Sequence, residues 1–87
     1  MAGTARREIR QLPDGPVEEV GEILRELKID PFGLQPKQLE GYDNLFSIRF
    51  YFGQYRMVCS ISESRRKVFI RRIRHRSTAY EGLKQHS

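Results

Sequence analysis

Residues 46–62 read FSIRFYFGQYRMVCSIS, and this stretch decides the fold. Apolar and polar side chains alternate along residues 45–51, as they do in a strand with one buried face. A turn centred on a glycine follows at residues 52–54. Residues 55–61 alternate again, so the stretch predicts a β-hairpin. The polar face of its first strand is expected to carry Ser47, Arg49 and Tyr51.

A third strand is predicted at residues 67–73, after a polar turn at residues 62–65. It belongs to the segment VFIRRIRHRSTAY, residues 68–80, which begins with β-forming apolar residues and then fills with arginine. Three strands joined by short turns form an antiparallel meander. Residues 81–87 are expected to add a last helical turn or to fray.

Two short amphipathic helices are predicted ahead of the hairpin. The first covers residues 4–12; the second begins near Pro16 and ends before Pro31, which disfavours helical geometry in the preceding residue. The connection at residues 31–44 is expected to be a packed loop. Such helices need a sheet to lie on, so the prediction is one α+β domain, residues 1–87, with a two-helix hairpin packed on the meander.

The positive charge is concentrated in the second half of the chain. Residues 1–43 hold six basic and nine acidic residues, whereas residues 44–87 hold ten basic and two acidic ones. Residues 65–76 alone carry seven of the sixteen lysines and arginines. Such a cationic segment is typical of a surface that binds nucleic acid. A solvated face of a basic protein remains the alternative.

Other classes of site have little support in the sequence. The lone Cys59 cannot form an internal disulfide and is expected to be buried. The histidines and this cysteine lack the spacing of a metal site, and no glycine-rich phosphate loop is present, so no metal and no cofactor are expected. The chain has no apolar run of membrane-spanning length and no signal-peptide pattern, which predicts a cytoplasmic protein without membrane contact.

The open face of the predicted sheet is the expected binding surface. Arg49 and Arg56 flank one turn and are expected to face the same side, with Tyr51 nearby. A cationic sheet face with an aromatic ring suits single-stranded nucleic acid. Further RNA contacts are expected from Arg65, Arg66, Lys67, Arg72 and Arg74.

Five sequence motifs occur in order over residues 4–82: TARREIRQLP, DPFG, LEG, FSIRFYFGQYRMVCSIS and IRHRSTAY. Together they resemble the RelE/ParE superfamily of bacterial toxins, the toxic halves of type II toxin–antitoxin pairs, with more similarity to the RelE branch. The resemblance implies a helical hairpin on a small antiparallel sheet. Family members usually open with a strand, which is short or absent here, so a three-stranded sheet with an exposed edge is expected.

The resemblance implies a function and partners. The RelE branch implies a ribosome-dependent endoribonuclease that cuts messenger RNA in the small-subunit decoding site, beside 16S rRNA. The ParE branch instead implies a poison of DNA gyrase. A non-toxic basic RNA-binding domain is the third alternative. Both toxin hypotheses imply a cognate antitoxin that covers the cationic face with acidic or apolar segments.

The resemblance also implies site residues. The catalytic positions of the RelE branch match Arg49, Arg56, Arg76, Tyr80 and His75. A shift of two residues would put Arg74 in place of Arg76. Ser47 lies where related toxins carry another basic residue, so one positive charge is missing.

Metal-independent RNA cleavage would give these residues distinct roles. The 2′-hydroxyl of the RNA is the nucleophile, and Arg49 and Arg56 would offset the charge that builds up on phosphorus. Arg76 would act as a charge beside the leaving 5′-oxygen. Tyr80 would take a proton, since clustered cations favour the phenolate, or would stack on a base. His75 carries the ring best suited to neutral acid–base work, although a structural role is the alternative.

Overall fold

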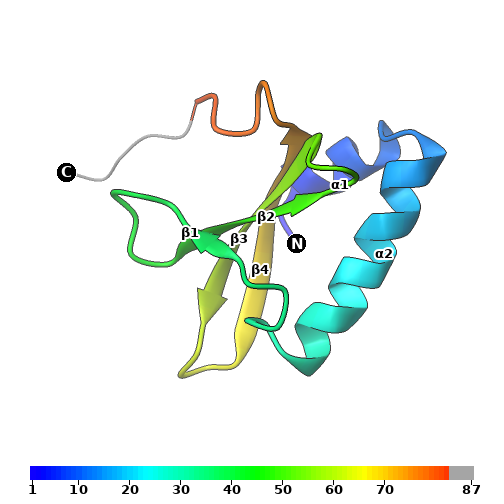
Figure 1. Cartoon of the computed structure of the whole chain (residues 1–87). Helices are drawn as coiled ribbons and strands as arrows, with labels where there is room; N and C mark the ends of the chain where they lie inside the picture. The colour runs from blue at the N-terminus through cyan, green and yellow to red at the C-terminus, as the bar shows by residue number, and fades with distance from the viewer. Residues whose placement is uncertain (83–87) are drawn as a thin grey trace.

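The computed structural model describes residues 1–82, and two helices open the chain. Helix α1 spans Gly3–Arg10 and α2 spans Asp14–Ile29, with Pro13 between them (Figure 1). Pro16 occupies the first turn of α2, where its missing N–H costs nothing, and the Asp14 carboxylate lies at the positive end of the helix dipole. The predicted helical hairpin is therefore confirmed.

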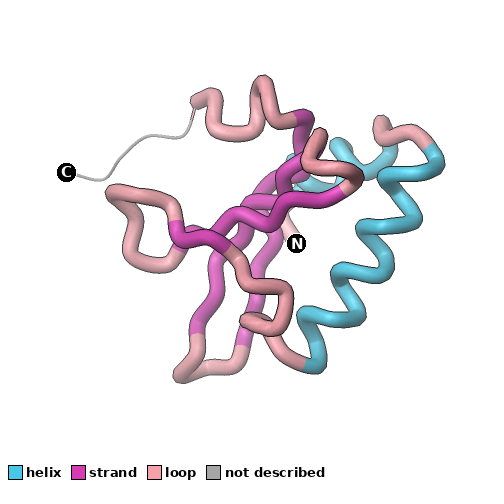
Figure 2. Tube along the Cα trace, in the orientation of Figure 1, coloured by secondary structure: helices cyan, strands magenta, loops and turns pink. Residues whose placement is uncertain are grey.

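Four antiparallel strands follow, in the spatial order β1-β2-β3-β4 (Figure 2). Their bounds are Lys37–Gln38 for β1, Leu45–Phe50 for β2, Tyr55–Ser62 for β3 and Lys67–His75 for β4. The meander of β2, β3 and β4 confirms the predicted strands. The prediction of a three-stranded sheet is wrong, because part of the predicted loop at residues 31–44 pairs with β2 as a fourth strand, β1.

The outer edge of β4 is partly covered by the beginning of the chain. Ala2 N donates a hydrogen bond to the Ile70 carbonyl at 2.9 Å, and Ile73 N donates one to Glu8 Oε1 at 2.9 Å. No strand lies ahead of α1 within residues 1–82, which agrees with the expected short or absent first strand. The β4 edge is therefore not bare, because α1 lies along it and Glu8 accepts the hydrogen bond of the Ile73 N–H. The outer strand at the other edge, β1, is exposed.

The hydrophobic core lies between α2 and one face of the sheet. Val20, Ile23 and Leu27 recur at helical spacing and supply the buried stripe of α2. Met57 and Cys59 on β3 are fully buried against them. Burial raises the pKa of the Cys59 thiol from its ordinary value of 9.0 to about 11, as expected for a structural cysteine. No helix in residues 1–82 has the length and apolarity needed to cross a membrane.

The predicted last helical turn or frayed end at residues 81–87 lies mostly outside the described residues. The described segment before it, residues 76–82, turns back over the sheet after β4 ends at His75 (Figure 1). We refer to residues 76–82 as the C-terminal strap.

Candidate functional site

Three arginines from three neighbouring strands share the sheet face opposite α2. Arg49 on β2 pairs directly with Arg56 on β3, and Arg56 pairs directly with Arg74 on β4. Residues directly opposite each other in an antiparallel sheet point to the same face. Arg49, Arg56 and Arg74 therefore form one line of positive charge, the arginine row. Like charges in this arrangement repel one another and destabilise the sheet.

The positive charges of the three arginines in the row have different partners. The guanidinium of Arg74 forms an ion pair with the Glu8 carboxylate. The guanidinium of Arg56 donates hydrogen bonds to the carbonyls of Gly53 and, at 3.1 Å, Tyr55. Arg49 is exposed, and within residues 1–82 its side chain has no hydrogen bond or ion pair. Arg49 lines a shallow hollow together with Glu19, Glu22 and Glu26 of α2. Because it forms no ion pair with them in the described residues, its guanidinium can still bind an anion beside the half-buried Arg56.

Tyr80 reaches this face through the C-terminal strap. Its hydroxyl lies 2.8 Å from Ser47 Oγ, and Ser47 belongs to the β2 face that carries Arg49. Ser47 is only 5% exposed, whereas Tyr80 is 45% exposed and accessible to a ligand. The structure thus places the predicted phenol over the same sheet face as the arginine row.

Arg72 holds the strap in place. Its Nη1 atom donates hydrogen bonds to the carbonyls of Ala79 at 3.0 Å and Glu81 at 2.6 Å. Val58 lies between Ser47 and Arg72 in the sheet and is fully buried, as is Ala79, so the strap packs directly onto β3. Burial, followed by the nearby charges of Arg74 and Arg71, lowers the pKa of Arg72. Arg72 is thus a positioning residue for Tyr80 in this structure.

His75 is not brought together with the arginine row. It pairs with Tyr55, and their rings meet edge to face with centroids 5.5 Å apart on the α2 side of the sheet. Ser77 N donates a hydrogen bond to His75 Nδ1 at 3.2 Å, and Ser77 Oγ lies 2.9 Å from the same atom. These contacts support the structural alternative for His75, and its catalytic role stays a prediction.

Arg76 lies one residue beyond β4. Its backbone N–H donates a hydrogen bond to the Gln54 carbonyl at 2.8 Å, and its side chain is exposed. Arg76 therefore lies beside the β2–β3 turn, next to the row rather than in it. The register favours Arg74 over Arg76 as the residue that shares a face with Arg56.

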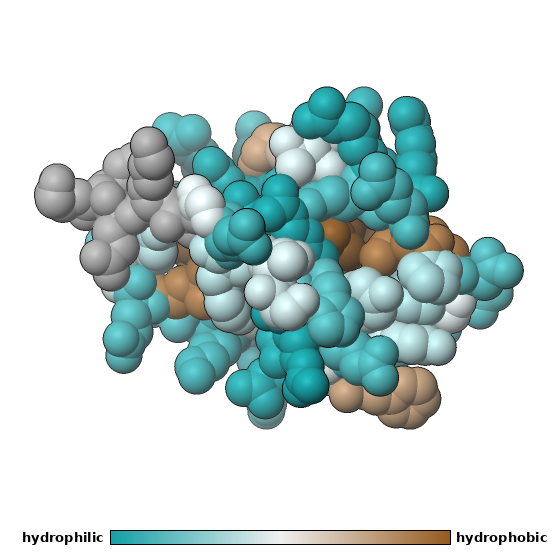
Figure 3. All heavy atoms as spheres, turned by 90° about the horizontal axis from the view of Figure 1, so that it is seen from above, coloured by the Kyte–Doolittle hydropathy of each residue, from teal (hydrophilic) through white to brown (hydrophobic). Residues whose placement is uncertain are grey.

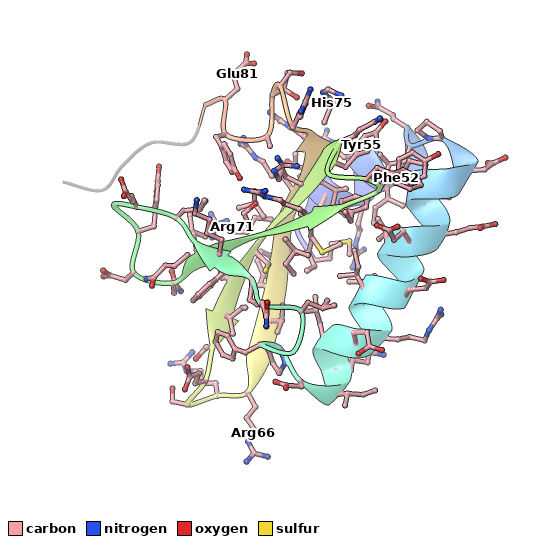
Figure 4. The ribbon with its side chains drawn as sticks, in the orientation of Figure 1. Phe52, Tyr55, Arg66, Arg71, His75 and Glu81 are labelled. Atoms are coloured by element: carbon pink, nitrogen blue, oxygen red, sulfur yellow. The ribbon has the colours of Figure 1, made fainter. Side chains whose placement is uncertain are left out.

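The remaining predicted contacts lie elsewhere. Arg65, Arg66 and Lys67 are exposed around the β3–β4 turn. Figure 4 shows Arg66 at the opposite end of the sheet from His75 and Tyr55. These three cations are therefore separated from the arginine row along the length of the strands.

The prediction that Tyr51 shares the arginine face is wrong. Strand β2 ends at Phe50, and Tyr51 takes a left-handed conformation with φ of 51°. Its ring packs toward Gly15 at the start of α2, where an added Cβ would come within 2.7 Å of the ring. Its backbone N–H donates a hydrogen bond to the Glu19 carboxylate. The turn thus ends the alternation of β2 one residue earlier than predicted.

Hydrophilic side chains cover most of the end of the molecule that carries the strap and the β2–β3 turn (Figure 3). At the other end, a cleft of about 840 Å³ runs between α2 and the β3–β4 strands, with Leu24, Ile29 and Phe32 among its lining residues. This cleft lies on the α2 side of the sheet and contains no member of the arginine row. The cationic face and the apolar cleft are therefore separate surfaces.

Two contacts of the site were missed from the sequence. In the sequence, Ser47 indicates only a lost positive charge, and no pattern points to Glu8. The Ser47 contact could have been found from the sequence, because the alternation along this strand places Ser47 on the same face as Arg49. The contact between Glu8 and Arg74 could not have been found from a local sequence pattern, because the two residues are 66 positions apart.

No protein-family model matches the sequence, and no curated protein matches it. Several solved structures do match. The toxin–antitoxin complex RelBE2 from Mycobacterium tuberculosis contains a chain that is 31% identical, with a TM-score of 0.68 over 86% of this chain and 91% of that chain.

Two further matches show the same fold at lower identity. The RelB–RelE antitoxin–toxin complex from Methanococcus jannaschii matches at 22% identity and a TM-score of 0.76, over 95% of this chain and 96% of that chain. The intact RelBE toxin–antitoxin complex of E. coli matches at 22% identity and a TM-score of 0.71, over 85% and 89% of the two chains. The fold thus matches along nearly its whole length.

Proposed function

The chain belongs to the RelE/ParE superfamily of toxins, and from this premise we propose that it is the toxin of a toxin–antitoxin pair and cuts messenger RNA on the ribosome. The observation that carries the proposal is the arginine row on the same sheet face as Tyr80. Guanidinium groups directed at a phosphate stabilise the charge that develops in phosphodiester cleavage, which favours a nuclease over a gyrase poison.

The proposed reaction uses the RNA as its own nucleophile. The 2′-oxygen attacks the adjacent phosphorus, and the bond from phosphorus to the 5′-oxygen breaks, which leaves a 2′,3′-cyclic phosphate and a 5′-hydroxyl. Arg49 and Arg56 bind the two non-bridging oxygens, and these charge-assisted bonds strengthen as negative charge builds up. The proton that the leaving oxygen needs comes from water, with Arg76 nearby as a positive charge.

Tyr80 is the proposed acceptor of the 2′-hydroxyl proton. Its hydroxyl is hydrogen-bonded to Ser47, which orients the ring over the face that carries the arginine row. Arg72 supports this geometry by holding the backbone on either side of Tyr80. His75 lies on the other side of the sheet, so the proposal gives it no step.

The proposed partners are a cognate antitoxin and messenger RNA in the small-subunit decoding site. The structural matches are toxin–antitoxin complexes, which supports an antitoxin partner. The excess of basic residues in residues 44–87 suits an acidic segment of that antitoxin, as well as the RNA that it would keep away. Co-expression with a short open reading frame beside this gene, followed by co-purification, tests the antitoxin.

The decisive assay is messenger-RNA cleavage on programmed ribosomes, with cut ends mapped by primer extension. Wild-type protein is expected to cut, and Arg56→Ala and Tyr80→Phe to cut far more slowly. Arg7→Ala removes an equal charge from the exposed face of α1 and serves as the matched control. Intact messenger RNA with all proteins would contradict the proposal; inhibition of gyrase supercoiling would then point to a ParE-type poison.

A further inference from the structure

Phe52 occupies a position in which the fold gains little from an aromatic ring. It lies in the β2–β3 turn with φ of 57°, and its side chain is 92% exposed. Left-handed backbone and exposure both favour glycine or asparagine in such a turn. Tyr51 and Gly53 on either side are also left-handed, with φ of 51° and 78°. Strained, exposed bulky residues concentrate where a ligand binds.

The ring of Phe52 contacts Tyr51, which belongs to a series of aromatic contacts at this end of the sheet. Its centroid lies 5.2 Å from that of Tyr51, which lies 6.1 Å from Tyr55, and Tyr55 contacts His75 at 5.5 Å. All these pairs meet edge to face. Figure 4 shows Phe52, Tyr55 and His75 at the same end of the sheet. Phe52 is therefore supported by its neighbours while most of its surface remains open to solvent.

Positive charge from two segments lies against the same turn. The Arg56 guanidinium hydrogen-bonds to the Gly53 carbonyl, the residue next to Phe52. Arg76 is tied through its backbone to Gln54. An anion bound by Arg56 would thus lie beside the turn that presents the exposed ring. Guanidinium groups next to an open aromatic ring are the arrangement with which proteins bind single-stranded nucleic acid.

We propose that Phe52 is a stacking platform for one base of single-stranded RNA whose neighbouring phosphate is held by Arg56. This inference rests on the proposed function, because it names a second subsite for the same RNA, at the β2–β3 turn next to the arginine row. The base stacks on the exposed ring, and the phosphate lies toward the arginine row. Because every base has a flat face, the platform tolerates any sequence. A protein segment, such as part of an antitoxin, is the competing occupant.

A single-tryptophan protein tests the platform directly. The chain contains no tryptophan, so Phe52→Trp creates a unique fluorophore at the turn. Ile29→Trp is the matched control, because Ile29 is also an exposed apolar residue, 80% exposed, at the end of α2. Each protein is titrated with a short oligouridylate and with an abasic phosphodiester oligomer of the same length and charge.

The expected result is quenching of the Phe52→Trp fluorescence by oligouridylate and much less by the abasic oligomer. The Ile29→Trp protein should respond to neither. Equal quenching by both oligomers, no quenching, or equal quenching of the two proteins would overturn the platform. A response of Phe52→Trp to antitoxin but not to oligouridylate would also overturn it, in favour of protein docking.

Kinetics separate this inference from the proposed function. Phe52→Leu keeps an apolar side chain without a π-face, and it is expected to raise KM for programmed ribosomes about tenfold with kcat nearly unchanged. Suppose that wild type cleaves messenger RNA, Phe52→Leu cleaves it with the same KM, and Phe52→Trp shows no quenching. These results would support the nuclease and contradict the stacking platform. Base-dependent quenching without cleavage by wild type would support the stacking platform and contradict the proposed nuclease. Thermal unfolding of each variant checks that the turn still folds.

Discussion

The hydroxyl of Ser47 lies 2.8 Å from the hydroxyl of Tyr80, although the two residues are 33 positions apart in the sequence. The contact joins β2 to the C-terminal strap across the face that carries the arginine row. It gives a role to a position at which the resemblance implies a basic residue. In place of a charge, Ser47 supplies a fixed partner for the phenol.

The first prediction concerns this contact. Ser47→Ala and Tyr80→Phe each remove it, so in a double-mutant cycle their effects on the free energy of unfolding should couple by about 0.5–1.5 kcal/mol. Urea unfolding measures the coupling. Ser47→Ala should also slow messenger-RNA cleavage, although less than Tyr80→Phe does. Strictly additive effects would mean that the hydrogen bond does not form in solution.

The second prediction separates activity from stability at Arg49. Arg49→Ala should lower the single-turnover cleavage rate by roughly 10²–10³-fold, because it removes one charge-assisted contact to the transition state. The same change relieves repulsion from Arg56, so the free energy of unfolding should stay equal or rise by a few tenths of a kcal/mol. A parallel loss of activity and stability would instead indicate a structural role for Arg49.

The third prediction concerns the ion pair at the edge of β4. Glu8→Ala leaves both the Ile73 N–H and the Arg74 guanidinium without their partner, which should lower the free energy of unfolding by about 1–3 kcal/mol. Glu8→Gln should lose less, because its side-chain oxygen can still accept the Ile73 hydrogen bond. Glu22→Ala on the exposed face of α2 is the control in urea unfolding. Equal midpoints for Glu8→Ala and Glu22→Ala would refute this account.

The fourth prediction is a pH dependence that originates at Cys59. Its pKa is raised in the folded protein from 9.0 to about 11, so the unfolded chain loses this proton first as the pH rises. The stabilising contribution is complete below pH 9.0 and is lost between pH 9.0 and about 11. Over that window the unfolding free energy of wild type should fall more steeply than that of Cys59→Ala, by roughly 1.4 kcal/mol per pH unit. Parallel curves would contradict the prediction.

The strands and helices could be predicted because their signals are local. The alternation of apolar and polar residues along residues 45–50 and 55–62 indicates which side chains face the core. Pro31 disfavours helical geometry in the residue before it, which predicts where α2 ends. Strand β1 could not be found in the same way, because Lys37 and Gln38 are both polar and exposed. They form a strand only through their pairing with β2, a contact that no local pattern encodes.

The composition of the candidate site was predictable, but its arrangement depends on one irregularity. Val58 pairs with Arg72 and Cys59 with Ile70, which leaves Arg71 without an opposite residue. This β-bulge determines which arginines of β4 share a face with Arg56, and the arginine-rich sequence allows several answers. The prediction for Tyr51 is wrong for a related reason. The alternation of apolar and polar residues does not show at which residue the backbone becomes left-handed and the strand ends.

The arginine row also makes the thermal stability of the protein depend on whether an anion is bound to it. Glu8 neutralises Arg74, but Arg49 and Arg56 are paired in the sheet without an ion pair among the described residues. A polyvalent anion that bridges Arg49 and Arg56 offsets their repulsion in the native state alone. Melting temperature should therefore climb with phosphate-bearing compounds in order of their valence. A simple thermal-shift screen could rank candidate ligands before any substrate is known.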